Sequence, residues 1–96
     1  MAVAVELRLK GATTQDYDRV LAALGYSPGG EGAPGGLFHW VMPTNDGLRI
    51  IDVWRDLETF ERFAQEKIAP AMQQAGVPSQ PEITTYPVHN YLFGPR

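Results

Sequence analysis

The sequence has no cysteine, which excludes disulfides, thiolate zinc sites and thiol nucleophiles. Its 8 Lys and Arg residues are outnumbered by 11 Asp and Glu residues, and no run of basic residues occurs, so a nucleic-acid partner is not expected. No apolar run approaches the roughly 18 residues of a membrane span, and the first residues lack the basic and then apolar segments of a secretory signal. Together these absences predict a cytoplasmic protein without nucleic-acid or membrane partners.

What the sequence does contain is typical of one folded domain. It has 96 residues, of which 44% are hydrophobic and 20% charged, and we expect a single domain over residues 1–96. A domain of this size buries only about 60% of the surface of its unfolded chain. Without disulfides, such a domain commonly gains stability from a partner subunit, so self-association is expected.

The spacing of apolar residues predicts four strands and two helices. Alternating or β-branched and aromatic residues indicate strands over residues 3–9, 37–42, 48–54 and 82–92. Apolar residues spaced three and four apart indicate helices, the first capped by Thr13 or Thr14 and ended by Gly25, the second running over 57–75. Pro70 should kink or split the second helix, and Pro87 places the last strand at a sheet edge or at a bulge.

This order of elements predicts an α+β fold of the ferredoxin-like, split βαβ kind (βαββαβ), with a four-stranded antiparallel sheet and two helices on one face. The two central strands are largely apolar on both faces, which is typical of strands covered on both sides. Two helices of one chain cover one face. We therefore expect a second copy to cover the other, giving a homodimer through the sheet faces.

Several short motifs stand out between residues 3 and 92: Gly36–Trp40, Asp46–Gly47, Asp52–Trp54, Phe60–Phe63 followed by Pro70, and Tyr86–Tyr91. With these motifs the chain resembles the dimeric α+β barrel superfamily, and within it small bacterial proteins similar to antibiotic biosynthesis monooxygenases. The resemblance implies the fold and the dimer more strongly than a function. Members of the superfamily differ in role, from cofactor-free oxygenation of polycyclic phenols to polyketide cyclisation, haem degradation and binding without known chemistry.

His39 and Asp52 form the candidate catalytic pair. If the hairpin loop near Thr44–Gly47 has two or four residues, His39 lies opposite Asp52 with both side chains on one face; a three-residue loop would pair Trp40 with Asp52 instead. A carboxylate within an apolar strand is costly unless it is paired. Paired with His39, it can fix the imidazole tautomer for a general base that removes a phenolic or enolic proton. The alternative is a buried pair that only fixes the strand register or the dimer.

Other candidate residues surround a ligand rather than react with it. The candidate substrate-binding residues are aromatic or imidazole side chains on the strands and the second helix: Trp40, Trp54, Tyr86, His89, Tyr91 and Phe60. The same side chains would equally suit a core and a dimer interface. His39 and His89 come from separate strands without the spacing of a metal motif, so no metal site is predicted. No flavin, nicotinamide or haem signature occurs, so no cofactor is predicted.

The sequence is compatible with two functions. The first is a small-molecule-binding protein that acts as a cofactor-independent monooxygenase or cyclase on an aromatic or polyketide-like substrate, with His39 as the base and Asp52 orienting it. The second is a non-catalytic ligand-binding or protein-interaction module in which His39 and Asp52 are a structural pair. A cavity that contains either residue would favour the first, and a filled core would favour the second.

Overall fold

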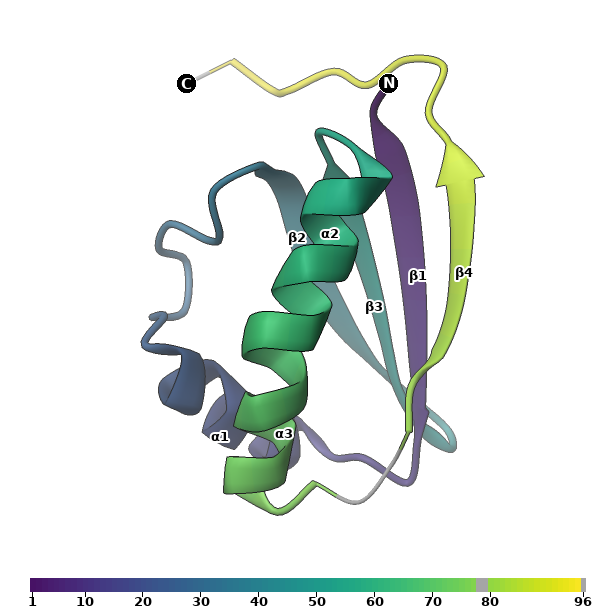
Figure 1. Cartoon of the computed structure of the whole chain (residues 1–96). Coiled ribbons are helices and arrows are strands. Elements are labelled where there is room, and N and C mark those ends of the chain that lie inside the picture. Colours follow the sequence, from purple (N-terminus) through teal and green to yellow (C-terminus); the bar gives the residue numbers. More distant parts are fainter. Residues whose placement is uncertain (78–79, 96) are drawn as a thin grey trace.

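A four-stranded antiparallel sheet carries all the helices on one face in the computed structural model, which describes residues 1–77 and 80–95 (Figure 1). The elements follow one another in the order expected from the sequence. Their bounds are β1 (Val3–Lys10), α1 (Thr14–Leu24), β2 (Gly36–Thr44), β3 (Gly47–Trp54), α2 (Leu57–Phe63), the π-helical turn η1 (Ala64–Ile68), α3 (Ala69–Ala75) and β4 (Glu82–Pro87). The ferredoxin-like α+β prediction is confirmed.

The strand order β2-β3-β1-β4 places β4 at an edge, as Pro87 predicted. The expectation that this strand runs to residue 92 is wrong, because it ends at Pro87. Pro87 pairs with Val3, the first residue of β1, so a longer β4 would have no strand beside it. After one further hydrogen bond, from the Val88 amide to the Ala2 carbonyl (3.0 Å), the chain leaves the sheet and crosses its upper end (Figure 1).

The hairpin between β2 and β3 has a two-residue loop, because Thr44 pairs directly with Gly47. This short loop sets the register along both strands and places His39 opposite Asp52. A bulge between Gly36 and Phe38 shifts the pairing only at the far end. The hairpin register predicted for a loop of two or four residues is therefore confirmed.

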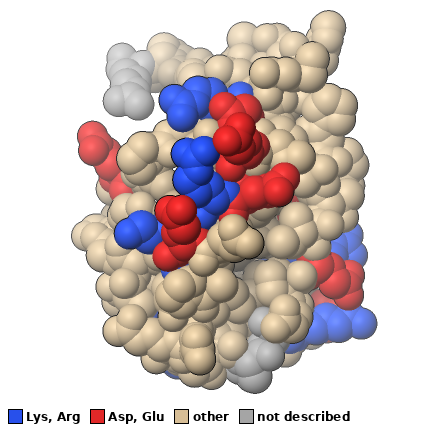
Figure 2. Space-filling model, in the orientation of Figure 1, with Lys and Arg blue, Asp and Glu red and all other residues tan. Residues whose placement is uncertain are grey.

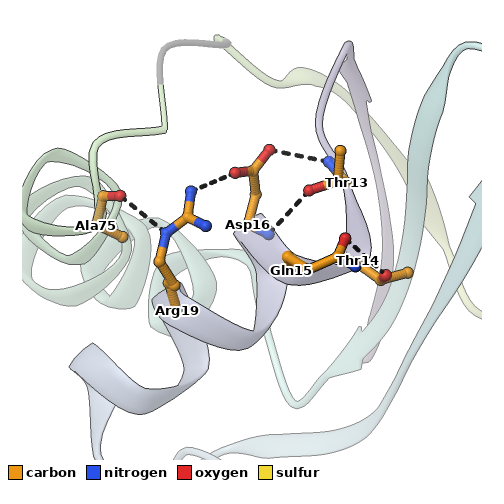
Figure 3. Close-up of polar contacts among 6 residues, drawn as sticks. All are labelled: Thr13, Thr14, Gln15, Asp16, Arg19 and Ala75. Carbon is orange, nitrogen blue, oxygen red and sulfur yellow. Dashed lines mark hydrogen bonds and ion pairs between the residues drawn. The ribbon is translucent and has the colours of Figure 1, made fainter.

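Helix α1 begins at a complete capping box (Figure 3). The Thr13 hydroxyl accepts from the Asp16 amide at 3.1 Å, and the Asp16 carboxylate accepts from the Thr13 amide at 2.9 Å. Arg19 pairs with Asp16 and donates to the Ala75 carbonyl at 3.3 Å, which ties α1 to the end of α3. Gly25 ends the helix in the left-handed conformation at φ 81°.

The second helical segment is interrupted before Pro70, as the sequence predicted. Proline has no amide hydrogen, and its ring clashes with the carbonyl four residues earlier in a regular α-helix. The chain opens into one π-helical turn, η1, in which the Ala69 amide bonds to the Ala64 carbonyl five residues back. Pro70 then stands in the first turn of α3, where its missing donor is tolerated. The segment continues instead of ending, and Ala64 and Ile68 of the irregular turn pack against the core.

The core lies between the sheet and the helices. It is formed by apolar side chains of β1 and β3 together with one aromatic side chain of α2: Val3, Val5, Leu7, Leu9, Leu48, Trp54 and Phe60. Among the described residues, no helix covers the opposite, outer face of the sheet (Figure 1), although Phe93 of the C-terminal segment stacks on Phe38. Phe38, Trp40 and Tyr86 lie there with about half of their surface exposed (44%, 41% and 51%).

Charged side chains of both signs mix on the surface of α2 instead of forming an area of one sign (Figure 2). Arg62 and Glu58 form an i, i+4 pair there at 3.0 Å. Among the described residues, none of the helices is long and apolar enough to cross a membrane.

Candidate functional site

A hydrogen bond of 2.5 Å joins His39 Nδ1 to Asp52 Oδ1 on the face of the sheet that carries the helices. The pair lies in the same cross-strand row as Val5, which is fully buried. Only 7% of the Asp52 side chain is exposed, whereas 46% of the His39 side chain is. The carboxylate is thus inside the fold, and the imidazole leads from it to the surface at the edge strand β2.

The second oxygen of the Asp52 carboxylate is also engaged. Trp54 Nε1 donates to Asp52 Oδ2 at 3.1 Å, from two residues further along the same strand and on the same face. Among the described residues, no buried side-chain nitrogen or oxygen is left without a hydrogen-bond partner. The buried carboxylate is therefore accommodated by two donors, the His39 imidazole and the Trp54 indole.

Helix α1 adds a third side chain that the sequence did not connect with this pair. The Tyr17 hydroxyl lies 2.6 Å from His39 Nε2, and the two rings stack with their centroids 5.9 Å apart at an interplanar angle of 16°. Tyr17 is not among the candidate site residues expected from the sequence. Its contact with His39 depends on how α1 crosses the sheet, which no short-range pattern in the sequence reports.

The hydrogen bonds determine where the protons lie. An ionised Asp52 can only accept, so His39 carries its proton on Nδ1. In the neutral imidazole, Nε2 then carries the lone pair and accepts a hydrogen bond from the Tyr17 hydroxyl. The result is a line of three groups, Tyr17, His39 and Asp52, which we call the Tyr–His–Asp relay. Trp54 donates to Asp52 at the buried end of this line.

Burial raises the pKa of the Tyr17 hydroxyl, and the negative charges of Asp52 and Asp18 raise this pKa further. All three effects disfavour a phenolate. Tyr17 therefore keeps its proton at neutral pH and acts as a donor to Nε2, in agreement with the tautomer that Asp52 imposes.

The structure separates the predicted ligand residues into three groups. Trp54 and Phe60 are core residues, 4% and 2% exposed, with ring centroids 5.7 Å apart. Trp40 and Tyr86 lie on the outer face of the sheet, opposite to the relay. The parity of the strand could have indicated this, because Trp40 follows His39 directly and so points to the other face.

His89 and Tyr91 belong to the C-terminal segment beyond β4, where both are exposed. Tyr91 contacts Phe93, which stacks on Phe38 with centroids 5.8 Å apart. Tyr91 is therefore near Phe38 at the start of β2, whose side chain lies on the opposite face of the sheet from His39. Within the described part of the chain, no three His, Asp or Glu side chains group in a way that could hold a metal ion.

A groove of about 860 Å³ lies between β4 and the second helical segment, on the other side of that segment from α1. Its lining is mainly apolar and includes Leu7, Phe60, Ile68, Met72 and Ile83. One of these, Phe60, is among the substrate-binding residues expected from the sequence. Neither His39 nor Asp52 lines the groove, so this groove and the relay are separate features.

Comparisons with known proteins give a fold relationship. No protein-family model matches the chain, and no curated protein sequence is detectably similar to it. Solved structures do match over nearly the whole chain. A candidate antibiotic biosynthesis monooxygenase from Chloroflexus aurantiacus is 20% identical with a TM-score of 0.64, covering 98% of this chain and 100% of its own.

Two structures with named activities are similar to the same extent. SnoaB, a cofactor-independent oxygenase from Streptomyces nogalater, is 19% identical with a TM-score of 0.58, covering 95% of this chain and 94% of its own. The ActVA-Orf6 monooxygenase of Streptomyces coelicolor, solved with nanaomycin D, is 16% identical with a TM-score of 0.58, covering 98% and 92%. The expected resemblance to antibiotic biosynthesis monooxygenase-like proteins is confirmed, and at this identity it shows a shared fold.

Proposed function

We propose that this protein binds an aromatic or polyketide-like small molecule and acts on it as a cofactor-independent monooxygenase or cyclase, with His39 as the base. The observation that carries the proposal is the hydrogen bond from His39 to a carboxylate that is almost fully buried. A buried carboxylate behind an imidazole fixes its tautomer and stabilises the imidazolium that forms when a proton is taken up. The fold shared with SnoaB and ActVA-Orf6 supports the substrate class.

Both reactions begin with the same step. A phenolic or enolic proton passes to His39 Nε2, and the electron pair stays on the substrate as an enolate. In the oxygenase, dioxygen is the oxidant: one of its atoms becomes the new carbonyl oxygen, the other leaves as water, and a CH₂ group is converted to C=O. In the cyclase, the enolate carbon forms a bond to a carbonyl carbon of the same molecule, and the proton returns to the resulting alkoxide.

The ligand reaches the relay from the solvent-exposed side of His39. Nearly half of this side chain is accessible, and it projects from the edge strand β2 toward α1. The neutral Trp54 indole and the apolar row around Val5 keep water from the other end of the pair. Asp52 orients the base without itself meeting the substrate.

A homodimer through the outer sheet faces completes the proposal. The outer face carries the exposed aromatic side chains Phe38, Trp40 and Tyr86, and an ion pair between Glu6 and Arg49 joins the two central strands on the same face. Glu6 is 9% exposed even in one chain. A second copy would remove the aromatic surface from water, which is the main source of free energy in such an association.

The second candidate function is non-catalytic binding in the groove between β4 and the second helical segment. The observation in its favour is that the groove is lined by neither member of the His39–Asp52 pair. In that case an apolar ligand lies against Phe60 and Met72, and the pair only fixes the β2–β3 register.

Oxygen uptake and product mass, measured with a panel of anthrones, naphthols and linear polyketide mimics, distinguish catalysis by His39 from non-catalytic binding in the groove. We expect turnover by the wild-type protein to fall at least about 100-fold in His39→Ala, the usual range for loss of a general base. Met72→Ala, which changes the groove, is the matched variant for the second candidate. Turnover that is unchanged in His39→Ala would reject His39 as the base, and ligand affinity lost only in Met72→Ala would favour binding without catalysis.

Light scattering tests the dimer. Trp40→Glu places a charge on the outer face and should give a monomer at micromolar concentration, whereas Gln74→Glu on the exposed side of α3 should leave the assembly unchanged. A wild-type protein that is monomeric under these conditions contradicts the dimer.

A further inference from the structure

The Tyr17 hydroxyl occupies the one imidazole nitrogen that is available to accept a proton. His39 Nδ1 is committed to Asp52 at 2.5 Å, and Nε2 lies 2.6 Å from the Tyr17 oxygen. A base whose lone pair already accepts a hydrogen bond cannot take a proton from a ligand directly unless that donor moves away. Tyr17 is therefore either an obstacle to the proposed chemistry or a member of it.

We infer that Tyr17 is the catalytic residue that meets the ligand, and that His39 and Asp52 act behind it as a proton relay. This inference rests on the proposed function and adds to it the residue that touches the reacting hydroxyl. The ligand class is a flat hydroxylated aromatic or enol, whose acidic O–H donates to the Tyr17 oxygen.

Two coupled proton transfers, from the ligand to Tyr17 and from Tyr17 to His39, conserve atoms and charge. The ligand O–H bond breaks as a new O–H bond forms on the Tyr17 oxygen, and the original Tyr17 proton moves to His39 Nε2. One proton has then passed from the ligand to the imidazole, the electron pair remains on the ligand as an enolate or phenolate, and Tyr17 is neutral before and after. The resulting imidazolium lies against the Asp52 carboxylate.

The surroundings of Tyr17 favour this shuttle over a stable phenolate. Burial and the negative charges of Asp52 and Asp18 oppose ionisation of the hydroxyl. Tyr17 therefore releases its proton to Nε2 only as it receives another. A phenol oxygen has the lone pairs to accept a second hydrogen bond while it donates the first.

Helix α1 holds Tyr17 in place for this role. The capping box at Thr13 fixes the first turn of the helix, and the Tyr17 amide itself bonds to the Thr13 carbonyl at 3.1 Å. One turn further on, Arg19 connects α1 to the Ala75 carbonyl at the end of α3 (Figure 3). The Tyr17–His39 contact thus joins two elements that are each fixed independently, as a relay with a constant donor–acceptor distance requires.

The ionisation of 1-naphthol bound to the protein tests the inference without a known substrate. Ultraviolet absorption distinguishes naphthol from naphtholate, and we expect the wild-type protein to increase the naphtholate fraction at pH 7.5. Tyr17→Phe, which removes one oxygen and keeps the ring, should abolish the increase while naphthol affinity changes less than about threefold. Tyr26→Phe, which removes a hydroxyl from the half-buried tyrosine just after the same helix, is the matched control and should behave as wild type.

The outcomes separate this inference from the proposed function. An increase that is equal in the wild type and in Tyr17→Phe, or that is absent from the wild type, overturns the role of Tyr17. An increase lost in His39→Ala but kept in Tyr17→Phe leaves His39 as a base that meets the ligand directly, so the proposed function survives and the inference fails. Nitrogen-15 NMR of His39 adds a readout of the contact itself, because the Nε2 resonance should shift in Tyr17→Phe and not in Tyr26→Phe.

Discussion

Replacement of Asp52 should reveal how much of the stability of the fold depends on the buried carboxylate. In Asp52→Ala, the Trp54 indole N–H is left without an acceptor in a side chain that is 4% exposed. A buried donor without a partner costs about 1–3 kcal/mol. The His39 N–H, on a half-exposed side chain, can turn to water and adds less. With the small cavity left by the carboxylate, we expect a loss of about 2–4 kcal/mol in the free energy of unfolding.

Asp52→Asn separates the two hydrogen bonds. The amide has the same size, and its oxygen can still accept from Trp54 Nε1, so the expected loss is only about 1–2 kcal/mol. Its NH₂ group, however, must donate to His39 Nδ1, which moves the imidazole proton to Nε2. Nε2 can then no longer accept from Tyr17. We therefore expect a stable protein in which the relay is reversed and base catalysis is lost.

Urea unfolding at a fixed protein concentration, with nitrogen-15 NMR of His39, measures both effects. A double-mutant cycle with His39→Ala isolates the coupling between the two side chains, expected at about 1–2 kcal/mol. A free energy of unfolding for Asp52→Ala within about 0.5 kcal/mol of the wild-type value would show that the carboxylate is solvated. A wild-type tautomer in Asp52→Asn would show that Asp52 does not determine the proton position.

Three further predictions concern local structure. Thr13→Ala removes half of the capping box and should lower stability by about 1 kcal/mol, or the melting temperature by roughly 4–8 °C, in thermal unfolding followed by circular dichroism; an unchanged melting temperature would show that the cap adds nothing. Gly47→Ala should lower the free energy of unfolding by about 2–4 kcal/mol, because a Cβ at this position would lie 2.1 Å from the Leu9 carbonyl oxygen. Near-wild-type stability would mean that the hairpin shifts to relieve the clash. Hydrogen bonds from the Thr59 hydroxyl and amide hold the pKa of Asp56 below its ordinary value, so its contribution to stability is complete above about pH 4 and is lost as the pH falls through the lowered pKa. Asp56→Asn should weaken this acid dependence in unfolding measured between pH 2 and 6, and an unchanged slope would contradict the assignment.

The features that depend on neighbouring residues could be predicted from the sequence. Thr13, Asp16 and Gly25 mark the ends of α1 because capping needs only a hydroxyl, a carboxylate and a glycine at fixed spacing. Pro70 indicated the break in the second helix because its missing donor disturbs the turn before it. The pairing of His39 with Asp52 was predicted for a loop of two or four residues and the pairing of Trp40 with Asp52 for a loop of three, and the structure shows a loop of two.

The extent of β4 and the positions of the aromatic side chains could not be predicted from neighbouring residues, because both depend on the pairing between strands. The end of β4 at Pro87 depends on where β1 begins, on the neighbouring strand. Trp40 and Tyr86 were grouped with His39 because all are polar-tipped or aromatic, although strand alternation and pairing place them on the opposite face. A stricter use of alternation would have separated Trp40 from His39, but the position of Tyr86 needs the β1–β4 register as well.

The contact between Tyr17 and His39 depends on how α1 and β2 pack in the tertiary structure. These residues are 22 positions apart, on a helix and an edge strand separated by a glycine-rich connection. Their distance depends on the angle at which α1 crosses the sheet, and that angle results from packing over the whole core together with the tie from Arg19 to α3. Local patterns place each side chain on its own element, but only the packing of the elements brings a phenol to within hydrogen-bonding distance of an imidazole.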